Sequence, residues 1–245
     1  MARSVLVTGG ARRIGRAIVE TLAAQGWRVL VHARRADDDE GRELAAQLKG
    51  DFLFGDLAAK GAADRLFQEA VGQAADLCAV VNNASMFSLA ANLPEHDAQA
   101  LWRVNAEVPQ RLTELLHAHL QNRGGAVVDL LDTRILPPAP AAATPYEASK
   151  RALADSLAPR ARRFADLLRV NAVAPGPVLK PSLAANSELG GETLLPTRPT
   201  AADVAAAVAY LLSAESVTGQ IIAVDSGQSL LRVLPFAVDI HEEIG

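Results

Sequence analysis

Short runs of β-branched and apolar residues alternate with longer Ala- and Leu-rich amphipathic segments along most of the chain. The runs predicted as strands are residues 4–8, 28–32, 51–54, 77–82, 126–131, 168–174 and 221–224. The segments predicted as helices are residues 14–25, 39–48, 64–75, 101–121, 145–164 and 201–213. Several strand runs are continuously apolar, which is typical of strands covered on both faces. This alternation predicts an α/β fold, a Rossmann-type doubly wound parallel sheet with helices on both faces.

The length and composition limit the kinds of protein that this chain can be. Residues 1–245, half of them hydrophobic, are predicted to form a single domain. A net charge of −4 and a pI near 5.8 argue against a nucleic-acid-binding or membrane-surface role. The single cysteine excludes an intramolecular disulfide and a multi-cysteine metal site, and no metal is expected. A strand pattern begins within the first residues and no apolar run has membrane-spanning length, so we expect a soluble, cytoplasmic protein.

A glycine-containing turn joins the first predicted strand to the first predicted helix. It reads Gly9-Gly10-Ala11-Arg12-Arg13-Ile14-Gly15. Glycines let the backbone approach a pyrophosphate, and the helix N-terminus supplies N–H donors and positive potential. Arg13 stands where a G-x-G-x-x-G motif has its middle glycine, and its cation can pair with phosphate. The turn predicts a dinucleotide-binding loop, and its alternative is an ordinary tight turn between a strand and a helix.

A basic stretch follows the second predicted strand and reads His32-Ala33-Arg34-Arg35. A cofactor without a 2′-phosphate favours an acid at this place, whereas arginine accommodates the 2′-phosphate. The stretch therefore predicts NADPH rather than NADH. The alternatives are a solvated basic turn and, for His32, a plain strand-end residue.

Tyr146 and Lys150 lie four residues apart, in a chain that has only two tyrosines. One helical turn of spacing places the phenol and the ammonium on the same helix face. An ammonium close to a phenol favours the phenolate and lowers the pKa of the phenol from about 10. The pair predicts a proton donor that works near neutral pH, and its alternative is two unrelated residues on a helix surface.

Several short motifs occur in order and together resemble those of the short-chain dehydrogenase/reductase family over nearly the whole chain. They are Thr8-Gly9-x-x-x-x-x-Gly15, Asn82-Asn83-Ala84-Ser85, Asn105, Tyr146-x-x-x-Lys150, Pro175-Gly176 and Val224-Asp225-x-Gly227. The resemblance implies that Tyr146 donates the proton and that Lys150 binds the nicotinamide ribose and lowers the pKa of Tyr146. It also implies that Asn105 holds a water leading to Lys150. A homotetramer is a further implication, which the C-terminal stretch, residues 230–245, would suit because it is apolar until Ile240.

The same resemblance implies a set of cofactor-binding residues. Asn83 and Ala84 would line the cofactor trough, Asp56 and Leu57 would flank the adenine, and Pro175-Gly176 would shape the nicotinamide pocket. The full set is Gly9, Arg13, Ile14, His32, Arg34, Arg35, Asp56, Leu57, Asn83, Ala84, Tyr146, Lys150, Pro175 and Gly176.

Three departures from the common family pattern resemble the pteridine reductases and the bacterial dihydromonapterin reductases. Arg13 replaces a glycine, Asp132 stands where most members carry a catalytic Ser, and Phe87 follows the Asn-Ala turn. By this resemblance Phe87 would stack on a pterin, and Ser85 and Arg13 would hydrogen-bond the pterin or the cofactor phosphate. The implied substrate-binding residues are therefore Arg13, Ser85, Phe87, Asp132 and Tyr146, and the implied catalytic residues are Asp132, Tyr146, Lys150 and Asn105.

Each departure has an alternative explanation. Phe87 could be core packing, and Asp132 could cap a turn. Thr133 lies thirteen residues before Tyr146, the usual Ser–Tyr interval of the family, but the strand register favours Asp132. Two further departures are Lys180, at the position of a cofactor-binding Thr, and Ser226, at the position of a glycine.

The function predicted from these residues is NADPH-dependent reduction of a pteridine. The substrate would be a dihydropterin such as dihydrobiopterin or dihydromonapterin, or dihydrofolate, and residues 177–200 would form a substrate loop. The first alternative is a carbonyl reductase acting on a 3-oxoacyl thioester or another ketone. The second is a dinucleotide-binding protein without catalytic activity.

Overall fold

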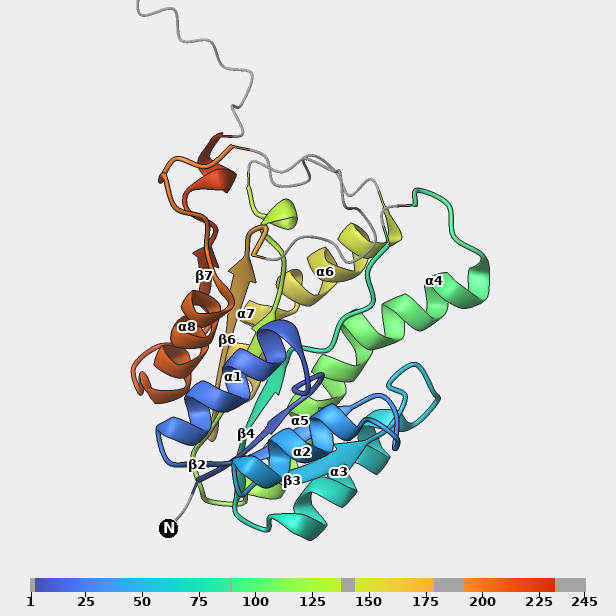
Figure 1. Cartoon of the computed structure of the whole chain (residues 1–245), viewed down its shortest axis with the longest axis vertical. Helices are drawn as coiled ribbons and strands as arrows, with labels where there is room; N and C mark the ends of the chain where they lie inside the picture. Colours follow the sequence, from blue (N-terminus) through green and yellow to red (C-terminus); the bar gives the residue numbers. More distant parts are fainter. Residues whose placement is uncertain (1–2, 89, 138–143, 179–191, 232–245) are drawn as a thin grey trace, which may run out of the picture.

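A parallel sheet runs through the centre of the molecule, between two layers of helices (Figure 1). The computed structural model describes residues 3–88, 90–137, 144–178 and 192–231. Within them the sheet has seven strands in the order β3-β2-β1-β4-β5-β6-β7, and every neighbouring pair is parallel. The strands are β1 Arg3–Val7, β2 Trp27–Ala33, β3 Asp51–Phe54, β4 Leu77–Asn82, β5 Gly125–Leu130, β6 Leu168–Pro175 and β7 Ile221–Val224. The predicted doubly wound α/β fold is confirmed.

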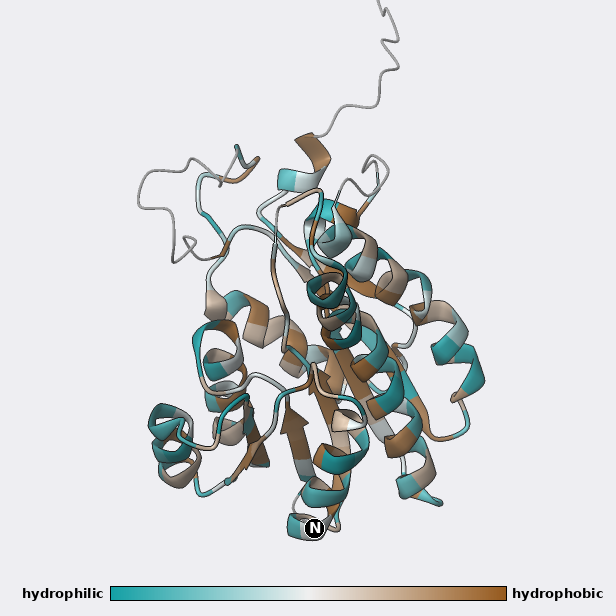
Figure 2. Ribbon diagram, turned by 90° about the vertical axis from the view of Figure 1, so that its right-hand side faces the viewer, coloured by the Kyte–Doolittle hydropathy of each residue, from teal (hydrophilic) through white to brown (hydrophobic). Residues whose placement is uncertain are grey.

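Successive residues of each inner strand belong to opposite cores, because side chains alternate across a strand. In β1, for example, Val5 and Val7 lie in one buried cluster and Leu6 in the other. The hydrophobic residues are concentrated on the strands and on the inner sides of the helices (Figure 2).

The helices divide between the two faces as these clusters show. One face is covered by α1 Arg13–Ala24, α2 Asp39–Gln47 and α8 Ala201–Ser213. The other face is covered by α3 Ala62–Gln73, α5 Val108–Leu120, α6 Pro145–Asp155 and α7 Leu157–Arg163. No helix in the described ranges is long and apolar enough to cross a membrane.

The helix predicted over residues 101–121 differs from the observed structure. Here α4, Glu95–Trp102, is followed by a π turn, Arg103–Glu107, and then by α5. Pro109, in the first turn of α5, has no N–H to donate to the carbonyl oxygen of Asn105 four residues before it. The π turn accommodates this break in the ladder, and such turns occur frequently at functional sites.

The predicted helix 145–164 is also divided, because α6 ends at Asp155 and α7 begins at Leu157. Most of the predicted substrate loop, residues 179–191, and Lys180 lie outside the described residues, as does 232–245 of the C-terminal stretch. Two 3₁₀ turns complete the described elements, Thr133–Ile135 after β5 and Gln228–Leu231 after β7.

The strand order reverses between β1 and β4, which are neighbours in the sheet although β2 and β3 come between them in the chain. In sheets of this kind, ligands bind outside the carboxyl ends of the strands at such a switch point. The turns that begin at Thr8 and Asn83 leave β1 and β4 there, and the candidate site is built around them.

Candidate active site

Tyr146 and Asp132 are joined by a hydrogen bond at the carboxyl end of the sheet. Asp132 follows the end of β5, and its Oδ1 accepts from the backbone N of Arg134 at 2.8 Å, which caps the following 3₁₀ turn. Thr144 forms a capping box with Glu147 and begins α6 two residues before Tyr146. The phenol oxygen of Tyr146 donates to Oδ2 of Asp132 at 2.8 Å. Asp132 therefore caps a turn with one oxygen and binds Tyr146 with the other.

The alternative residue, Thr133, is buried, whereas Asp132 is only partly buried. The hydrogen bond of the Tyr146 phenol goes to the carboxylate of Asp132. The strand register, which places Asp132 at this position, agrees with the contact.

The pKa of Tyr146 is raised, not lowered as its spacing from Lys150 predicted. Burial of the phenol is the main cause, followed by the charge of the Asp132 carboxylate and its hydrogen bond. Arg134 and Ser85 act in the opposite direction and lower the pKa of Tyr146. The expectation that Lys150 makes this phenol acidic is wrong for this arrangement. The Tyr146 proton is instead held between the phenol and a carboxylate.

Lys150 turns away to the backbone of the adjacent strand. Its Nζ donates to the carbonyl oxygen of Leu130 at 2.7 Å, and the side chain is buried. Burial lowers the pKa of Lys150 to about 8, while the carboxylates of Asp132 and Asp129 raise it. The ammonium is therefore close to losing its proton under mildly alkaline conditions.

A buried ion pair lies below Lys150 and was not predicted. Asp129 and Arg160 are both buried and are joined through Oδ2 and Nη2. Oδ1 of Asp129 accepts from Nδ2 of Asn82 at 2.8 Å, and Nη1 of Arg160 donates to Thr113 at 3.0 Å. The network joins β4, β5, α5 and α7 beneath the site.

Phe87 is exposed and its ring contacts that of Tyr146, so the alternative that it is core packing is wrong. Its side chain is 53% exposed. The two rings meet edge to face, with centroids 4.8 Å apart and planes at 74°. The guanidinium of Arg134 lies over the Phe87 ring, 5.3 Å from its centroid. Arg134 is a candidate site residue that the sequence did not reveal, because it belongs to no recognised motif.

Asn105 uses its carboxamide to tie the segment before Phe87 to α6. Its Oδ1 accepts from the backbone N of Met86 at 2.9 Å and from the hydroxyl of Ser85 at 3.2 Å. Its Nδ2 donates to the carbonyl oxygen of Met86 at 2.8 Å and to Oγ of Ser149 at 3.1 Å. Ser149 in turn donates to the carbonyl oxygen of Tyr146 at 2.7 Å. The described contacts assign the side chain of Asn105 to positioning this segment.

The predicted nucleotide loop is held by Thr8 and Asn83. Nδ2 of Asn83 donates to the carbonyl oxygens of Thr8 and Gly9, both at 2.9 Å. The hydroxyl of Thr8 accepts from the backbone N of Asn83 and of Ala84, both at 3.0 Å. A Cβ added at Gly15 would lie 2.0 Å from the carbonyl oxygen of Gly9, so only glycine fits there. Thr8 belongs to the first sequence motif, but its linking role becomes visible only in three dimensions.

Arg13 begins α1 in the left-handed region, with φ 55°. That conformation favours glycine, the residue that it replaces in the common motif. Its side chain is exposed, and the N-cap, Arg12, makes no side-chain cap to the helix. The N–H groups of the first turn, including that of Ile14, are thus oriented for an anion.

The basic stretch after β2 divides into one buried and two exposed residues. His32 is 2% exposed; its Nδ1 accepts from the backbone N of Gly9 at 3.2 Å, and its Nε2 lies 3.0 Å from the carbonyl oxygen of Gly55. Both ring nitrogens therefore contact the protein backbone. That His32 binds the cofactor stays a prediction.

Arg34 and Arg35 extend from the end of β2 into solvent. Arg35 binds Asp37 through two hydrogen bonds, of 2.7 and 2.6 Å. Nε of Arg34 lies 3.9 Å from Oδ2 of Asp56, which begins the turn after β3, and Leu57 is buried beside it. The arginines and the Asp56 turn thus flank one surface.

On the other side of β5, Gly176 packs against the turn after β7. A Cβ on Gly176 would lie 2.7 Å from that of Asp225, so the close approach requires glycine. Asp225 accepts from the backbone N of Gly227 at 3.0 Å and of Ser229 at 2.8 Å. Ser226 has a φ of 54°, which explains why a glycine is common at this position. Pro175 ends β6 and places Gly176 at the carboxyl edge.

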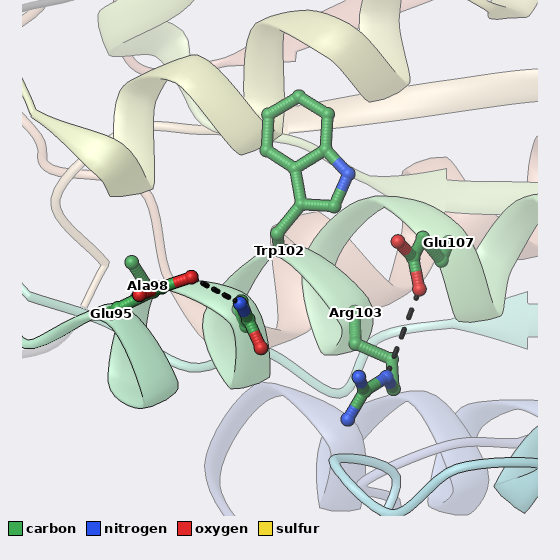
Figure 3. Close-up of a pocket in the computed structure, with 6 residues that line it drawn as sticks. Glu95, Ala98, Trp102, Arg103 and Glu107 are labelled. Carbon is green, nitrogen blue, oxygen red and sulfur yellow. Dashed lines mark hydrogen bonds and ion pairs between the residues drawn. The ribbon is translucent and has the colours of Figure 1, made fainter.

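A surface pocket of about 420 Å³ lies against α4 and the π turn (Figure 3). It is lined by Glu95, Ala98, Gln99, Trp102, Arg103 and Glu107, on α4 and the π turn. None of the predicted site residues contributes to it. Across the described ranges, no cluster of three or more His, Cys, Asp or Glu side chains could hold a metal ion.

Comparisons with known proteins match nearly the whole chain. A sequence family described as Enoyl-(Acyl carrier protein) reductase matches residues 9–229. The dihydromonapterin reductase of Citrobacter koseri is 29% identical, over 92% of this chain and 96% of its own. The 3-oxoacyl-[acyl-carrier-protein] reductase FabG of Staphylococcus aureus is 31% identical, over 93% of this chain and 98% of its own.

A solved structure, FolM alternative dihydrofolate reductase 1 from Brucella suis in complex with NADP, has the same fold. Its TM-score is 0.83 at 33% identity, and the match covers 95% of this chain and 97% of that one. With both the sequence motifs and the sheet in agreement, the chain belongs to the short-chain dehydrogenase/reductase family.

Proposed function

We propose that this protein reduces a pteridine with NADPH. The substrate is a dihydropterin such as dihydrobiopterin or dihydromonapterin, or dihydrofolate. The observation that carries the proposal is the 2.8 Å hydrogen bond from Tyr146 to Asp132, where a ketone reductase of this family has a serine hydroxyl. Similarity to a dihydromonapterin reductase and to FolM alternative dihydrofolate reductase 1 supports it.

The residues around the first βα turn fit NADPH, whose nicotinamide supplies a hydride when it is bound. The uncapped start of α1 and the exposed Arg13 suit the pyrophosphate. Arg34 and Arg35 suit a 2′-phosphate, because they are exposed cations at the end of β2. Arg35 is already bound to Asp37, so Arg34 is the cation that we expect to contact the phosphate first. The NADP complex of the Brucella suis relative supports this choice of cofactor.

The chemistry of a pterin explains why an acid belongs beside the tyrosine. A pterin is reduced at a C=N bond, and once the ring carbon has been reduced a ring nitrogen must take a proton. We assign that proton to Tyr146: its O–H bond breaks as the ring N–H bond forms. A phenolate next to a carboxylate would place two negative charges at hydrogen-bond distance. Transfer is therefore favoured when a solvent proton reaches Asp132 in the same step, and partial exposure of Asp132 permits this.

The other residues position the substrate and the reacting groups, and they balance charge in the site. Lys150 holds a positive charge near Asp132 and Asp129, and Asn105 fixes the segment that leads to Phe87. The exposed ring of Phe87 offers a flat face on which a planar pterin can stack. Arg134 covers this ring and adds a cation at the edge of the site.

A ketone is the second candidate substrate, because the Staphylococcus aureus relative is a 3-oxoacyl reductase at a comparable identity. The test is to mix the purified protein with NADPH and either a dihydropterin, dihydrofolate or a 3-oxoacyl thioester, and to follow NADPH absorbance. The proposal predicts consumption of NADPH with at least one pteridine. Turnover of ketones without turnover of any pteridine would overturn it.

We also propose that the protein is a cytoplasmic homotetramer. Trp102 on α4 is 40% exposed beside the pocket of Figure 3, which supports an assembled form in which it is covered. Light scattering should return four times the mass of the 25.8 kDa chain. A monomer mass would contradict the proposal.

A further inference from the structure

We propose that His32 is a positioning residue for the adenosine half of the cofactor. It joins the loop after β1 to the loop after β3 through one buried imidazole. The ring receives a hydrogen bond from Gly9 in the first loop and contacts Gly55 in the second. These two loops carry the residues assigned above to the pyrophosphate and the adenine, and both ring nitrogens of His32 are engaged by the loop backbone.

The two contacts fix which ring nitrogen carries the proton. The backbone N–H of Gly9 can only donate, so Nδ1 of His32 must accept and is bare. In the neutral ring the proton is then on Nε2, which donates to the carbonyl oxygen of Gly55 at 3.0 Å. Burial lowers the pKa of His32 to about 4, against smaller opposing effects of Gly55 and Asp56. Near neutral pH the ring therefore acts as one acceptor and one donor.

The backbone of the same strand end makes two more connections. The carbonyl oxygen of His32 accepts from the backbone N of Gly10 at 2.9 Å, and that of Ala33 accepts from the backbone N of Gly55 at 3.0 Å. The backbone N–H groups of Gly9 and Gly10 thus both donate to His32. The backbone N–H of Gly55 donates to Ala33, and its carbonyl oxygen contacts the ring of His32. The backbone of residues 32 and 33 therefore holds the loop after β1 and the loop after β3 in place. The imidazole of His32 adds one further contact to each loop.

The position of His32 makes its role separable from proton transfer. The residues assigned to proton transfer follow the end of β5 or lie on α6, and two strands, β1 and β4, separate β5 from β2 in the sheet. Loss of the ring should therefore weaken binding of the adenosine half of the cofactor. The maximal rate with saturating NADPH should stay the same.

Three substitutions separate the two contacts. An asparagine amide reaches about as far as Nδ1 of histidine, so His32→Asn can retain the acceptor for Gly9. A glutamine amide reaches about as far as Nε2, so His32→Gln can retain the donor to Gly55. His32→Leu removes both contacts and keeps a buried apolar side chain. His119→Leu is the matched control, because His119 lies on α5 against Phe67 and Arg123, away from both loops.

The experiment measures dissociation constants by fluorescence titration with NADPH and with the adenosine bisphosphate fragment that carries the 2′-phosphate. We expect His32→Leu to weaken both by roughly tenfold, as expected for two hydrogen bonds of ordinary strength. His32→Asn and His32→Gln should fall between His32→Leu and the natural protein, and His119→Leu should change neither constant.

A second reading distinguishes positioning from general loss of structure. Turnover with reduced nicotinamide mononucleotide, which lacks the adenosine half, should be the same in all variants. Unchanged NADPH affinity in His32→Leu would overturn the proposal, and so would a parallel loss of turnover with the mononucleotide. If His32→Leu does not fold, the Asn and Gln variants carry the same comparison. Because the titrations use no pteridine, a failure of the pteridine assignment leaves them interpretable.

Discussion

The phenol of Tyr146 donates its hydrogen bond to Oδ2 of Asp132, and Oδ1 of the same carboxylate accepts from the backbone N of Arg134. One acid side chain thus fixes both the start of the 3₁₀ turn after β5 and the direction of the tyrosine proton. Because burial and this carboxylate together raise the pKa of Tyr146, the phenol keeps its proton at neutral pH. The phenol therefore still carries a proton before the reaction, which the proton-donor role proposed for Tyr146 requires.

Replacing Tyr146 with phenylalanine removes the donor and keeps the ring beside Phe87. We expect the rate of pteridine reduction to fall by roughly 10²–10⁴-fold, the usual contribution of a positioned general acid. NADPH should still bind, because the nucleotide loop does not depend on the phenol oxygen. Steady-state rates and a fluorescence titration measure the two effects. A Tyr146→Phe protein that turns over normally would show that the proton comes from elsewhere.

Arg13 offers a prediction in which stability and binding change in opposite directions. Its φ of 55° is unfavourable for a side-chain-bearing residue, and Arg13→Gly should raise the free energy of unfolding by about 1 kcal/mol. The same change removes the cation and should raise the KM for NADPH. Arg13→Ala is the matched control, since it removes the cation but keeps the strained conformation. Thermal unfolding and NADPH kinetics of both variants provide the comparison, and equal stabilities of the Gly and Ala variants would contradict it.

Lys150 gives the protein a pH-dependent stability whose sign is fixed by its burial. The pKa of Lys150 is about 8 in the folded protein, against 10.5 for the ordinary side chain. Below pH about 8 both states are protonated, and burial of the charge opposes folding. Between the two pKa values only the unfolded chain holds the proton, so the free energy of unfolding rises by about 1.4 kcal/mol per pH unit.

Lys150→Met should abolish this rise. The difference in urea unfolding midpoint between the natural protein and Lys150→Met, followed from pH 8 to 10, measures it, because the ionisation of Tyr146 and Cys78 in the unfolded chain is common to both proteins. Parallel pH dependence in the natural protein and in Lys150→Met would show that this amine keeps an ordinary pKa.

Gly15 tests whether the nucleotide loop is as tightly packed as its contacts indicate, and Gly72 on α3 serves as the unpacked comparison. Gly15→Ala would force a methyl group to 2.0 Å from the carbonyl oxygen of Gly9, and we expect loss of NADPH binding. Gly72, near the end of α3, has no atom within 4 Å of an added Cβ. Gly72→Ala should therefore stabilise the protein by about 0.5–1 kcal/mol, the gain for this change in a helix. Calorimetry measures the stability of both variants and the binding of NADPH to Gly15→Ala. A Gly15→Ala protein that is stable and binds NADPH would show that Gly15 is not tightly packed against Gly9.

Periodicity predicted the fold well, because buried parallel strands and their helices carry strong local patterns. It did not predict the π turn at residues 103–107, which depends on Pro109 having no N–H for Asn105. It did not predict the buried Asp129–Arg160 pair either, because the two residues come from separate elements.

For the candidate site, the motifs identified residues but not what each one contacts. Spacing along α6 placed Lys150 near Tyr146, but the ammonium binds Leu130 on a different element, so the predicted effect on the pKa of Tyr146 was wrong. The sequence places His32 in one basic stretch with Arg34 and Arg35, and does not show that its side chain is buried while theirs are exposed. Its burial depends on how the strand end packs between two loops, which no local pattern records.

The most direct test of the account compares the natural protein with Asp132→Ser on a dihydropterin and on a 3-oxoacyl thioester, each with NADPH. The measured quantity is the ratio of kcat/KM for the two substrates. If Asp132 makes this a pteridine site, the natural protein should favour the dihydropterin. The substitution should then lower pteridine turnover by about 100-fold or more while sparing ketone turnover, as expected for loss of a group acting in proton transfer. A ratio that Asp132→Ser leaves unchanged, or a natural protein that prefers the ketone, would contradict the assignment.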